Sequence, residues 1–316
     1  MASFEYEGTY YEFVMSLGTG SFADTYQYMT NDGSLYTVKI FKPQTRRGIY
    51  NKEVTTLKKL SKLCHIISVP CLHTNFIVDS TDTLLYEIFS HILPLVSSTS
   101  LSSSTQSADS SIYRVIIYNF FNGIVFSDII SGRYKKTIPF DLQLLLSFGE
   151  QLLYIISVLH DNGIAHRDIK PRNIIWNFDT KQLSLIDFGT ACEEQHFITP
   201  FAGTLLYVLP EVVNDDKYVS FEQALASDMY AIGVNMYIYI TGYNPYPVKE
   251  VTQVLNGVKK TTLTINTTTD PFRRSRPNLD SIPMVYYEIL EQLILDTQQN
   301  FNIDSKQMYN RWREES

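Results

Sequence analysis

The sequence predicts an α+β protein in two lobes, with a sheet-rich first third and a mostly helical remainder. Short apolar runs separated by glycine turns fill residues 10–41, which favours a small sheet. Apolar residues at helical spacing dominate after residue 141. We expect a ligand cleft between the two lobes, since such boundaries often hold binding sites.

Composition places the chain among folded globular proteins. Its 316 residues suffice for one large or two modest domains. Hydrophobic residues make up 44% and charged residues 19%, which excludes a mostly disordered chain. The net charge of -7 gives no argument for nucleic-acid binding, so no nucleic-acid partner is expected.

Cysteine use and the chain ends predict a cytoplasmic protein. Cys64, Cys71 and Cys192 show no CxxC spacing, which argues against disulfides and a zinc site, so we expect reduced thiols. Neither end carries a secretion or lipidation motif. The longest apolar run, 231–240, is shorter than the ~20 residues that span a bilayer. We therefore expect no membrane anchor, and a nucleocytoplasmic or host-cell location is the alternative.

Three strands and one helix are predicted in the first lobe. Strands at 10–17, 25–29 and 35–41 are separated by a glycine-containing turn and by Asn-Asp-Gly at 31–33, a strong hairpin signal. A helix is predicted over 51–63, because apolar residues recur there at intervals of three.

A serine-rich segment interrupts the first lobe. Residues 97–111, SSTSLSSSTQSADSS, have too few apolar side chains to offset the entropy of ordering, so we expect a flexible loop. The loop is either a phosphorylated segment or a plain solvated insert. A buried strand is predicted to follow at 112–118.

Helices are predicted through most of the second lobe. A long apolar helix should cover 142–160, with Asp141 as its N-cap and Asp-Asn-Gly at 161–163 as its end. Two short strands are expected at 173–176 and 183–186. Further helices are predicted at 226–241, 247–258, 284–298 and 304–313.

A glycine-rich turn, LGTGSFADTY, begins at Leu17. Gly18 and Gly20 allow the backbone to approach a phosphate, whose oxygens can accept hydrogen bonds from free N–H groups. Ala23 stands where a third glycine would complete GxGxxG. Taken alone, the pattern also fits an ordinary glycine-rich hairpin.

A lysine lies in the middle of the apolar strand YTVKI. Because strand side chains alternate, Thr37 and Lys39 face the same way. A buried ammonium needs an anionic partner. Glu53 shares the inward side of the predicted helix with Leu57 and Leu60, so we predict a Lys39–Glu53 ion pair. The alternative is a surface lysine and a solvated glutamate.

The strings IAHRDIKPRNII and SLIDFGTA carry the strongest chemical signal. Asp168, Lys170 and Asn173 lie within six residues, and Asp187 follows nineteen after Asp168. Carboxylate and amide oxygens suit Mg²⁺. A carboxylate can orient a reacting hydroxyl, and a lysine can balance the charge of a transferred phosphate.

With these motifs in place, the chain resembles a eukaryotic-type protein kinase of the serine/threonine type over nearly its whole length. The resemblance implies a bilobal kinase fold in a single domain, 1–316. Its parts would be a first lobe at 1–118 with the insert at 97–111, a hinge at 119–123 and a second lobe at 124–316.

The resemblance also implies ATP and Mg²⁺ as cofactors and assigns roles to residues. Asp168, Lys170 and Lys39 would be catalytic, with Asp168 accepting the proton of the acceptor hydroxyl. Asn173 and Asp187 would bind the metal. The residues implied in cofactor binding are Leu17, Gly18, Thr19, Gly20, Ser21, Phe22, Ala23, Thr25, Thr37, Lys39, Glu53, Asn119, Phe121, Asn173, Ile175 and Asp187.

Further positions bear on the type of kinase. The resemblance places the catalytic loop at His166–Asn173. In serine/threonine kinases the threonine that matches Thr204 contacts the aspartate and lysine of this loop, which implies protein Ser/Thr substrates. Asp228 matches the aspartate that begins the family's long buried helix. Thr199 would be a phosphosite for an upstream kinase or for self-phosphorylation, with Arg167 as its partner. A nucleotide-binding pseudokinase and a kinase of small molecules or lipids are the alternatives.

Some positions depart from the family pattern. Ala23, Thr25 and Thr37 replace a glycine, a valine and an alanine that line the adenine pocket. Asn300 stands where an arginine usually pairs with Glu211. The candidate substitutes for that arginine are Arg273, Arg274 and Arg276.

Substrate choice can also be predicted from the resemblance. Val125, Arg172 and Ile238 occupy places where kinases that select arginine carry acidic residues. We therefore expect no preference for arginine upstream of the acceptor, and tolerance of acidic or phosphorylated neighbours.

Overall fold

The computed structural model divides into two compact units, Met1–Phe121 and Asn122–Ser316. The lobe limits at 118 and 124 and the hinge stay predictions, and the serine-rich segment 97–111 lies outside the described residues. The described residues are 3–79, 112–135, 137–194, 198–200, 202–214, 218–246, 248–255, 258–265, 267, 271–272, 278–296 and 303–315.

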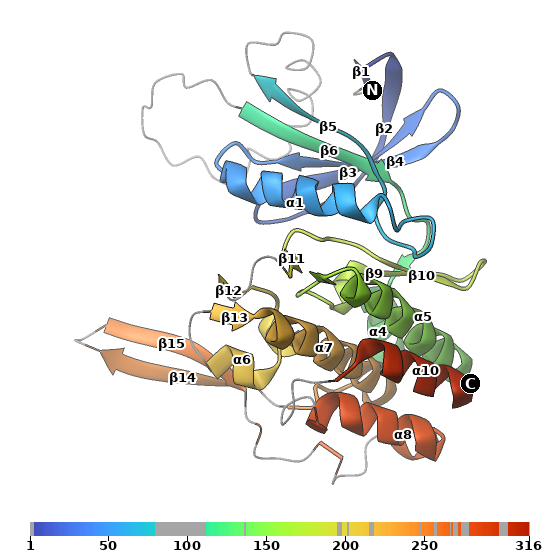
Figure 1. Cartoon of the computed structure of the whole chain (residues 1–316), viewed down its shortest axis with the longest axis vertical. Helices are drawn as coiled ribbons and strands as arrows, with labels where there is room; N and C mark the ends of the chain where they lie inside the picture. Colours follow the sequence, from blue (N-terminus) through green and yellow to red (C-terminus); the bar gives the residue numbers. More distant parts are fainter. Residues whose placement is uncertain are drawn as a thin grey trace. The chain divides into compact units, whose positions relative to one another are not determined.

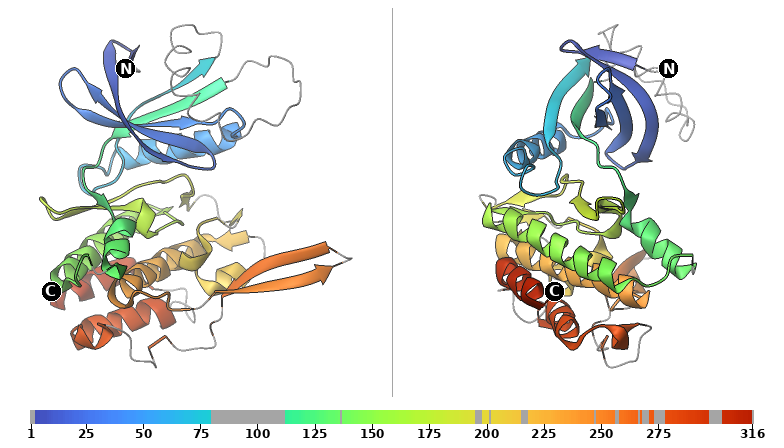
Figure 2. Two further views of the ribbon diagram at one scale, coloured as in Figure 1. Left: turned by 180° about the vertical axis from the view of Figure 1, so that it is seen from behind. Right: turned by 90° about the vertical axis from the view of Figure 1, so that its right-hand side faces the viewer.

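The first unit is a six-stranded antiparallel sheet with one helix across it (Figures 1 and 2). The strand order is β1-β2-β3-β4-β6-β5. The elements are β1 (Ser3–Tyr6), β2 (Thr9–Thr19), β3 (Ala23–Thr30), β4 (Leu35–Phe41), α1 (Arg47–Leu60), β5 (Leu72–Asp79) and β6 (Ile112–Asn119). The four predicted strands and the helix are confirmed, whereas β1 and β5 were not predicted.

The two faces of this sheet differ in character. One face carries an apolar cluster that includes Val38, Ile40 and Ile117, and in it the aromatic rings of Phe4 and Tyr28 meet edge to face. The side chains that alternate with Val38 and Ile40 on β4 lie on the opposite face, which carries Lys39. The predicted alternation of YTVKI is therefore confirmed.

The second unit is mostly helical and contains several short strand pairs (Figures 1 and 2). Its helices are α4 (Phe126–Tyr134), α5 (Leu142–Asp161), α6 (Pro210–Asn214), α7 (Phe221–Thr241), α8 (Met284–Glu291) and α10 (Ser305–Glu315). Its strands are β7 (Ile124–Val125), β8 (Ile164–Ala165), β9 (Ile174–Asn177), β10 (Gln182–Leu185), β11 (Cys192–Glu193), β12 (Ile198–Pro200), β13 (Tyr218–Ser220), β14 (Val248–Leu255) and β15 (Val258–Ile265). A three-residue helical turn at Pro171–Asn173 precedes β9.

Helix α5 forms where the sequence predicts it. The Asp141 carboxylate accepts hydrogen bonds from the backbone N–H groups of Gln143 and Leu144, which caps the helix. Gly163, at a φ of +67°, follows its end. The helix is long and apolar enough to cross a membrane by length and composition alone. Its apolar side chains pack against α7 and α10, as expected of a core helix.

Helix α7 is the most buried element of the second unit. The side chain of Ser220 accepts from the backbone of Gln223, whose side chain accepts from the backbone of Ser220, forming a capping box. From Ala226 to Thr241 every side chain is buried, including the carboxylate of Asp228. Helix α7 therefore holds the Asp228 side chain in a fixed position.

One helix prediction is wrong. The range predicted as a helix, 247–258, contains strand β14, which pairs antiparallel with β15 from Val248↔Ile265 to Leu255↔Val258. The sequence there is rich in valine and threonine, which favour strands, and Asn-Gly stands between the two strands as in tight hairpins. In the described part of the predicted helix 284–298, α8 is followed by a π-helical turn at Gln292–Asp296, and residues 297–298 lie outside the described residues.

The prediction of reduced thiols is wrong for two of the three cysteines. The structure joins Cys64 and Cys71 as a disulfide, with their Cα atoms 5.4 Å apart, whereas Cys192 is buried and takes no part in a disulfide. The missing CxxC spacing was a poor guide because the turns after α1 bring the two residues together.

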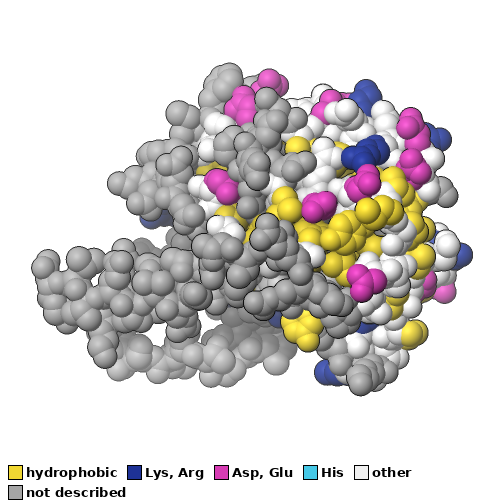
Figure 3. All heavy atoms as spheres, turned by 90° about the horizontal axis from the view of Figure 1, so that it is seen from below, with side chains coloured by type: hydrophobic (Ala, Val, Ile, Leu, Met, Phe, Trp, Pro, Cys, Tyr) yellow, Lys and Arg dark blue, Asp and Glu magenta, His cyan; other side chains and the backbone are white. Residues whose placement is uncertain are grey.

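The surface of the molecule carries both signs of charge. Figure 3 shows one face, on which an apolar strip is bordered by acidic and basic side chains. Single apolar side chains are also exposed, such as Met284 at the start of α8.

Candidate functional site

The glycine-rich turn joins β2 to β3 in the first unit. Leu17, Gly18 and Thr19 end β2 and are exposed, and Ser21 and Phe22 are exposed in the turn itself. The turn is closed by a 2.9 Å hydrogen bond from Gly20 N to the carbonyl oxygen of Ala23, which is buried at the start of β3. The turn thus leaves an exposed run of backbone between two strands.

The predicted Lys39–Glu53 ion pair is formed. Lys39 Nζ lies 2.7 Å from Glu53 Oε1, and only 3% of the Glu53 side chain is exposed. Thr25 lies opposite Lys39 on the neighbouring strand, and Thr37 is buried two residues before it. These four side chains of the first unit are therefore brought together on β3, β4 and α1.

The end of β6 carries the residues assigned to the hinge. The Asn119 carboxamide oxygen accepts a hydrogen bond from Cys71 N at 2.6 Å, and Phe120 N donates to the Leu35 carbonyl oxygen. Phe121 is half-buried. Asn119 thus fixes the start of β5, and its role toward a cofactor stays a prediction.

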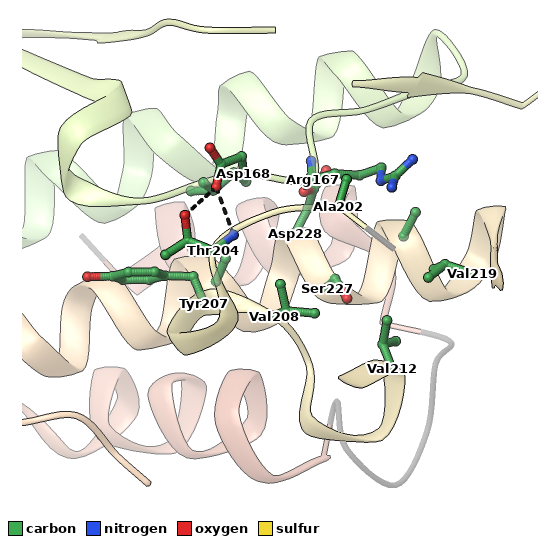
Figure 4. Close-up of a pocket in the computed structure, with 13 residues that line it drawn as sticks. Arg167, Asp168, Ala202, Thr204, Tyr207, Val208, Val212, Val219, Ser227 and Asp228 are labelled. Atoms are coloured by element: carbon green, nitrogen blue, oxygen red, sulfur yellow. Dashed lines mark hydrogen bonds between the residues drawn. The ribbon is translucent and has the colours of Figure 1, made fainter. Parts of the chain in front are cut away.

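In the second unit, four donors hold the carboxylate of Asp168. Lys170 Nζ lies 2.6 Å from Oδ2, and Asn173 Nδ2 lies 3.2 Å from the same atom. Thr204 donates to Oδ1 from its backbone N at 3.0 Å and from its hydroxyl at 2.8 Å (Figure 4). Lys170 also donates to the Thr204 hydroxyl oxygen at 3.0 Å. The Asp168 side chain is therefore fixed in direction and surrounded by positive or donor groups.

Gly203 explains how Thr204 reaches this position. Its φ is +117°, and a Cβ there would collide with the carbonyl oxygen of Arg167. Only glycine allows the backbone at residue 203 to approach the backbone of Arg167 so closely. Gly203 thus allows the backbone N–H and the hydroxyl of Thr204 to donate to the Asp168 carboxylate.

A second buried carboxylate holds the backbone of the catalytic loop. Asp228, 1% exposed on α7, accepts hydrogen bonds from His166 N and Arg167 N, each at 2.7 Å. The ring nitrogen Nε2 of His160 lies 3.2 Å from the same carboxylate. Arg167 has a φ of +68°, a conformation that these bonds stabilise.

The triplet Asp187-Phe188-Gly189 lies against the same loop. Ile186 N donates to the Asn173 carbonyl oxygen at 2.9 Å, directly before Asp187. Phe188 is buried against the His166 ring, with ring centroids 4.6 Å apart. Asn173 and Asp187 are therefore adjacent in the second unit, and Ile175 lies half-buried on β9 beside them.

The chemistry of these side chains fits Mg²⁺. Asn173 Nδ2 donates to the Asp168 carbonyl oxygen at 2.8 Å, which leaves the carboxamide oxygen as the ligand atom. No group of three or more His, Cys, Asp or Glu suited to a metal occurs among the described residues. A pair of oxygen ligands supplemented by water and phosphate is the usual environment of Mg²⁺ beside a nucleotide.

The family resemblance implied the contacts of Thr204 with Asp168 and Lys170, and these are confirmed. It named Asp228 without giving it a contact in the site. Thr204 and Asp228 both act on the catalytic loop from far along the chain, so only folding brings them to it. Thr199 lies in β12 opposite Val219, and its side chain lies outside the described part, so phosphorylation there stays a prediction.

The family position of Glu211 suggests an arginine partner, and the described residues show none. Its Oε2 is buried without a hydrogen-bond partner among the described residues, and burial raises the pKa of the carboxyl. Asn300 and the predicted substitutes Arg273, Arg274 and Arg276 lie outside the described residues.

We expect Glu211→Gln to leave stability at pH 7 unchanged or raised. A raised folded-state pKa means that the folded chain holds this proton more tightly than the unfolded chain. Stability from this group is therefore fully present below the unfolded value of 4.5 and is lost as pH rises through the folded pKa. Urea unfolding of the wild type and of the variant between pH 4 and pH 7 checks this prediction. Only the wild type should lose free energy of unfolding through this group as pH rises. A loss above about 1 kcal/mol at pH 7 in the variant would instead reveal an ionic partner.

Comparison with known proteins agrees with this geometry. The family model described as protein kinase domain matches residues 11–301. CBL-interacting protein kinase 10 of Oryza sativa subsp. japonica is 24% identical over 79% of this chain and 48% of its own length. Calcium/calmodulin-dependent protein kinase type 1 of Caenorhabditis briggsae is 28% identical over 75% of this chain and 56% of its own length.

A shorter stretch is more similar. Serine/threonine-protein kinase GL21140 of Drosophila persimilis is 39% identical over 29% of this chain and 12% of its own length. The chain spans about half the length, or less, of the relatives that it matches. The family model covers most of the sequence, including the glycine-rich turn and the lysines and carboxylates of the site. The chain therefore belongs to the protein kinase domain family.

Proposed function

We propose that the chain is a Mg²⁺-dependent kinase that transfers the γ-phosphate of ATP to serine and threonine hydroxyls of proteins. Membership of the protein kinase family supports phosphoryl transfer to protein as the reaction. The names of relatives such as the Drosophila persimilis kinase support the choice of acceptor. The finer assignments come from the contacts of Asp168.

The observation that carries the proposal is the bonding of Lys170 and Thr204 to the Asp168 carboxylate. Lys170 Nζ is 2.6 Å from Asp168 and 3.0 Å from the Thr204 hydroxyl, so its charge lies beside the atom that would accept a proton. Such a lysine can stabilise a phosphoryl group as it approaches the acceptor. The Thr204 bonds fix the segment on which a peptide would lie against the catalytic carboxylate.

The other residues of the proposed site would act on the ATP phosphates, Mg²⁺ and the acceptor hydroxyl. Lys39, held by Glu53, would neutralise the charge of the α- and β-phosphates. When bound, Mg²⁺ would neutralise phosphate charge, with Asn173 and Asp187 holding it. Asp168 would orient the acceptor hydroxyl and take its proton. The exposed backbone at 17–22 would cover the phosphates.

Phosphoamino-acid analysis tests the choice of acceptor. The purified chain is incubated with Mg-ATP and a protein mixture that contains serine, threonine and tyrosine acceptors. We expect phosphoserine and phosphothreonine in the product and no phosphotyrosine above that of the Asp168→Asn variant. Phosphotyrosine as the main product, or phosphate found only on small molecules or lipids, would contradict the proposal.

We also propose that Arg172 influences substrate choice. It is exposed in the helical turn between Lys170 and Asn173. A like-charge contact at ~4 Å costs on the order of 1 kcal/mol, which is several-fold in selectivity. A peptide array should therefore show no selection for arginine two or three residues upstream of the acceptor, and Arg172→Glu should move the preference toward basic peptides. Strong arginine selection by the wild type would show that Arg172 does not contact the peptide.

A further inference from the structure

The Cys64–Cys71 disulfide lies where helix α1 connects to strand β5. Both residues are half-buried, in contrast to a fully buried pair. Cys192 is the third cysteine and is buried in β11 of the other unit. The chain thus has one half-buried pair and one buried thiol.

A continuous set of hydrogen bonds links this pair to the end of α1. Cys64 N donates to the Leu60 carbonyl oxygen at 2.8 Å, and Ser61 N donates to the Leu57 carbonyl oxygen at 2.9 Å. The Ser61 hydroxyl in turn accepts from Leu72 N at 3.1 Å. Hydrogen-bonded turns therefore follow the end of α1 as far as Cys64.

The other cysteine is tied to the sheet. Cys71 N donates to the Asn119 carboxamide oxygen at 2.6 Å, and Asn119 N donates to the Cys71 carbonyl oxygen at 3.4 Å. Asn119 ends β6, the strand that pairs with β4 and lies beside Lys39. The disulfide therefore connects the helix that carries Glu53 to the sheet that carries Lys39.

We propose that Cys64 and Cys71 form a reversible redox site, exchanged by low-molecular-weight thiols and disulfides of the glutathione class, that controls the position of α1. In the reducing direction two glutathione thiols break the protein S–S bond. The protein gains two electrons and two protons, and the two glutathione sulfurs form one disulfide. The oxidising direction is the reverse, so atoms and electrons balance with this one reagent.

The expected consequence follows from the restraint that the bond adds. A disulfide limits the conformations open to the segment that it closes. Cys64 lies three helical turns after Glu53, so release of the bond gives the C-terminal end of α1 more freedom while its hydrogen bonds remain. The Lys39–Glu53 distance of 2.7 Å should then be held for a smaller fraction of the time. The effect on activity rests on the proposed kinase function, whereas the effects on thiol count and stability do not.

Thiol counting tests whether the site exists. The chain is purified without reductant, unfolded in the presence of an alkylating reagent and weighed by mass spectrometry. We expect one alkylated cysteine, Cys192, before treatment and three after reduction with glutathione. Three alkylated cysteines before treatment, with no return to one in oxidised glutathione, would overturn the proposal.

Stability and activity test the control of α1. Reduction should lower the thermal midpoint of the first unit's unfolding by about 5 °C and lower kinase activity several-fold, and oxidised glutathione should restore both. The double variant Cys64→Ser, Cys71→Ser should stay at the reduced level in either reagent. Cys192→Ser is the matched control and should respond as the wild type does.

The outcomes separate this proposal from the proposed function. An equal midpoint and equal activity in the oxidised and reduced forms, or a response that persists in the double variant, would overturn redox control. Absence of kinase activity in both forms would count against the proposed function, and the thiol count and midpoint would still decide the redox site.

Discussion

Asp168→Asn should lower phosphoryl transfer by a factor of about 10² to 10⁴ while Mg-ATP binding stays near the wild-type value. The carboxylate accepts bonds from Lys170, Asn173 and Thr204, and an asparagine keeps the shape of the side chain and one accepting oxygen for part of these bonds. A carboxamide cannot accept the proton of the acceptor hydroxyl. The turnover number should therefore fall without a matching fall in nucleotide affinity.

The measurement pairs steady-state kinetics with calorimetric titration of Mg-ATP. Asp187→Ala should lose magnesium-dependent nucleotide binding as well as turnover, because it removes a proposed metal ligand. Asp179→Asn is the matched control, since Asp179 is exposed in the connection between β9 and β10 and should change neither quantity. Near-normal turnover in Asp168→Asn would show that another group takes the proton.

Asp228→Asn should lower the free energy of unfolding by about 3 kcal/mol and reduce activity with it. The buried carboxylate accepts from His166 N and Arg167 N, each at 2.7 Å. An asparagine offers one accepting oxygen, and its NH₂ group would face an N–H donor at the other position. One buried backbone donor of the catalytic loop is then left unsatisfied.

Urea unfolding monitored by tryptophan fluorescence measures this loss. The control is Asp161→Asn, which removes an exposed carboxylate at the end of α5 and should change stability by less than about 0.5 kcal/mol. Asp228→Asn with wild-type stability would show that the catalytic loop does not depend on this anchor.

Local features of the fold were accessible from the sequence. The N-cap at Asp141 and the turn at 31–33 depend on neighbouring residues only, so pattern and structure agree there. The helix predicted at 247–258 is wrong because apolar spacing alone does not distinguish a helix from a hairpin of β-branched residues. Strand β5 was not predicted because its sequence, LHTNFIVD, has an apolar run of only three residues, at 76–78.

The candidate site shows the same division between local and distant effects. Lys39 and Glu53 were paired from strand alternation and helix spacing, both of which are short-range rules. The contacts of Thr204 with Asp168 span thirty-six positions, and those of Asp228 with His166 span sixty-two. The disulfide was missed because no spacing rule describes a pair closed by turns after a helix.

Transfer of phosphate itself tests the central claim most directly. The purified chain is incubated with ATP labelled at the γ position, with Mg²⁺ or with a chelator, and phosphate incorporated into an acceptor protein is counted per molecule of chain. The account predicts many transfers per molecule with Mg²⁺, background levels with the chelator, and loss of transfer in Asp168→Asn. Binding of Mg-ATP with no transfer above the level of that variant would contradict the account and identify a nucleotide-binding scaffold.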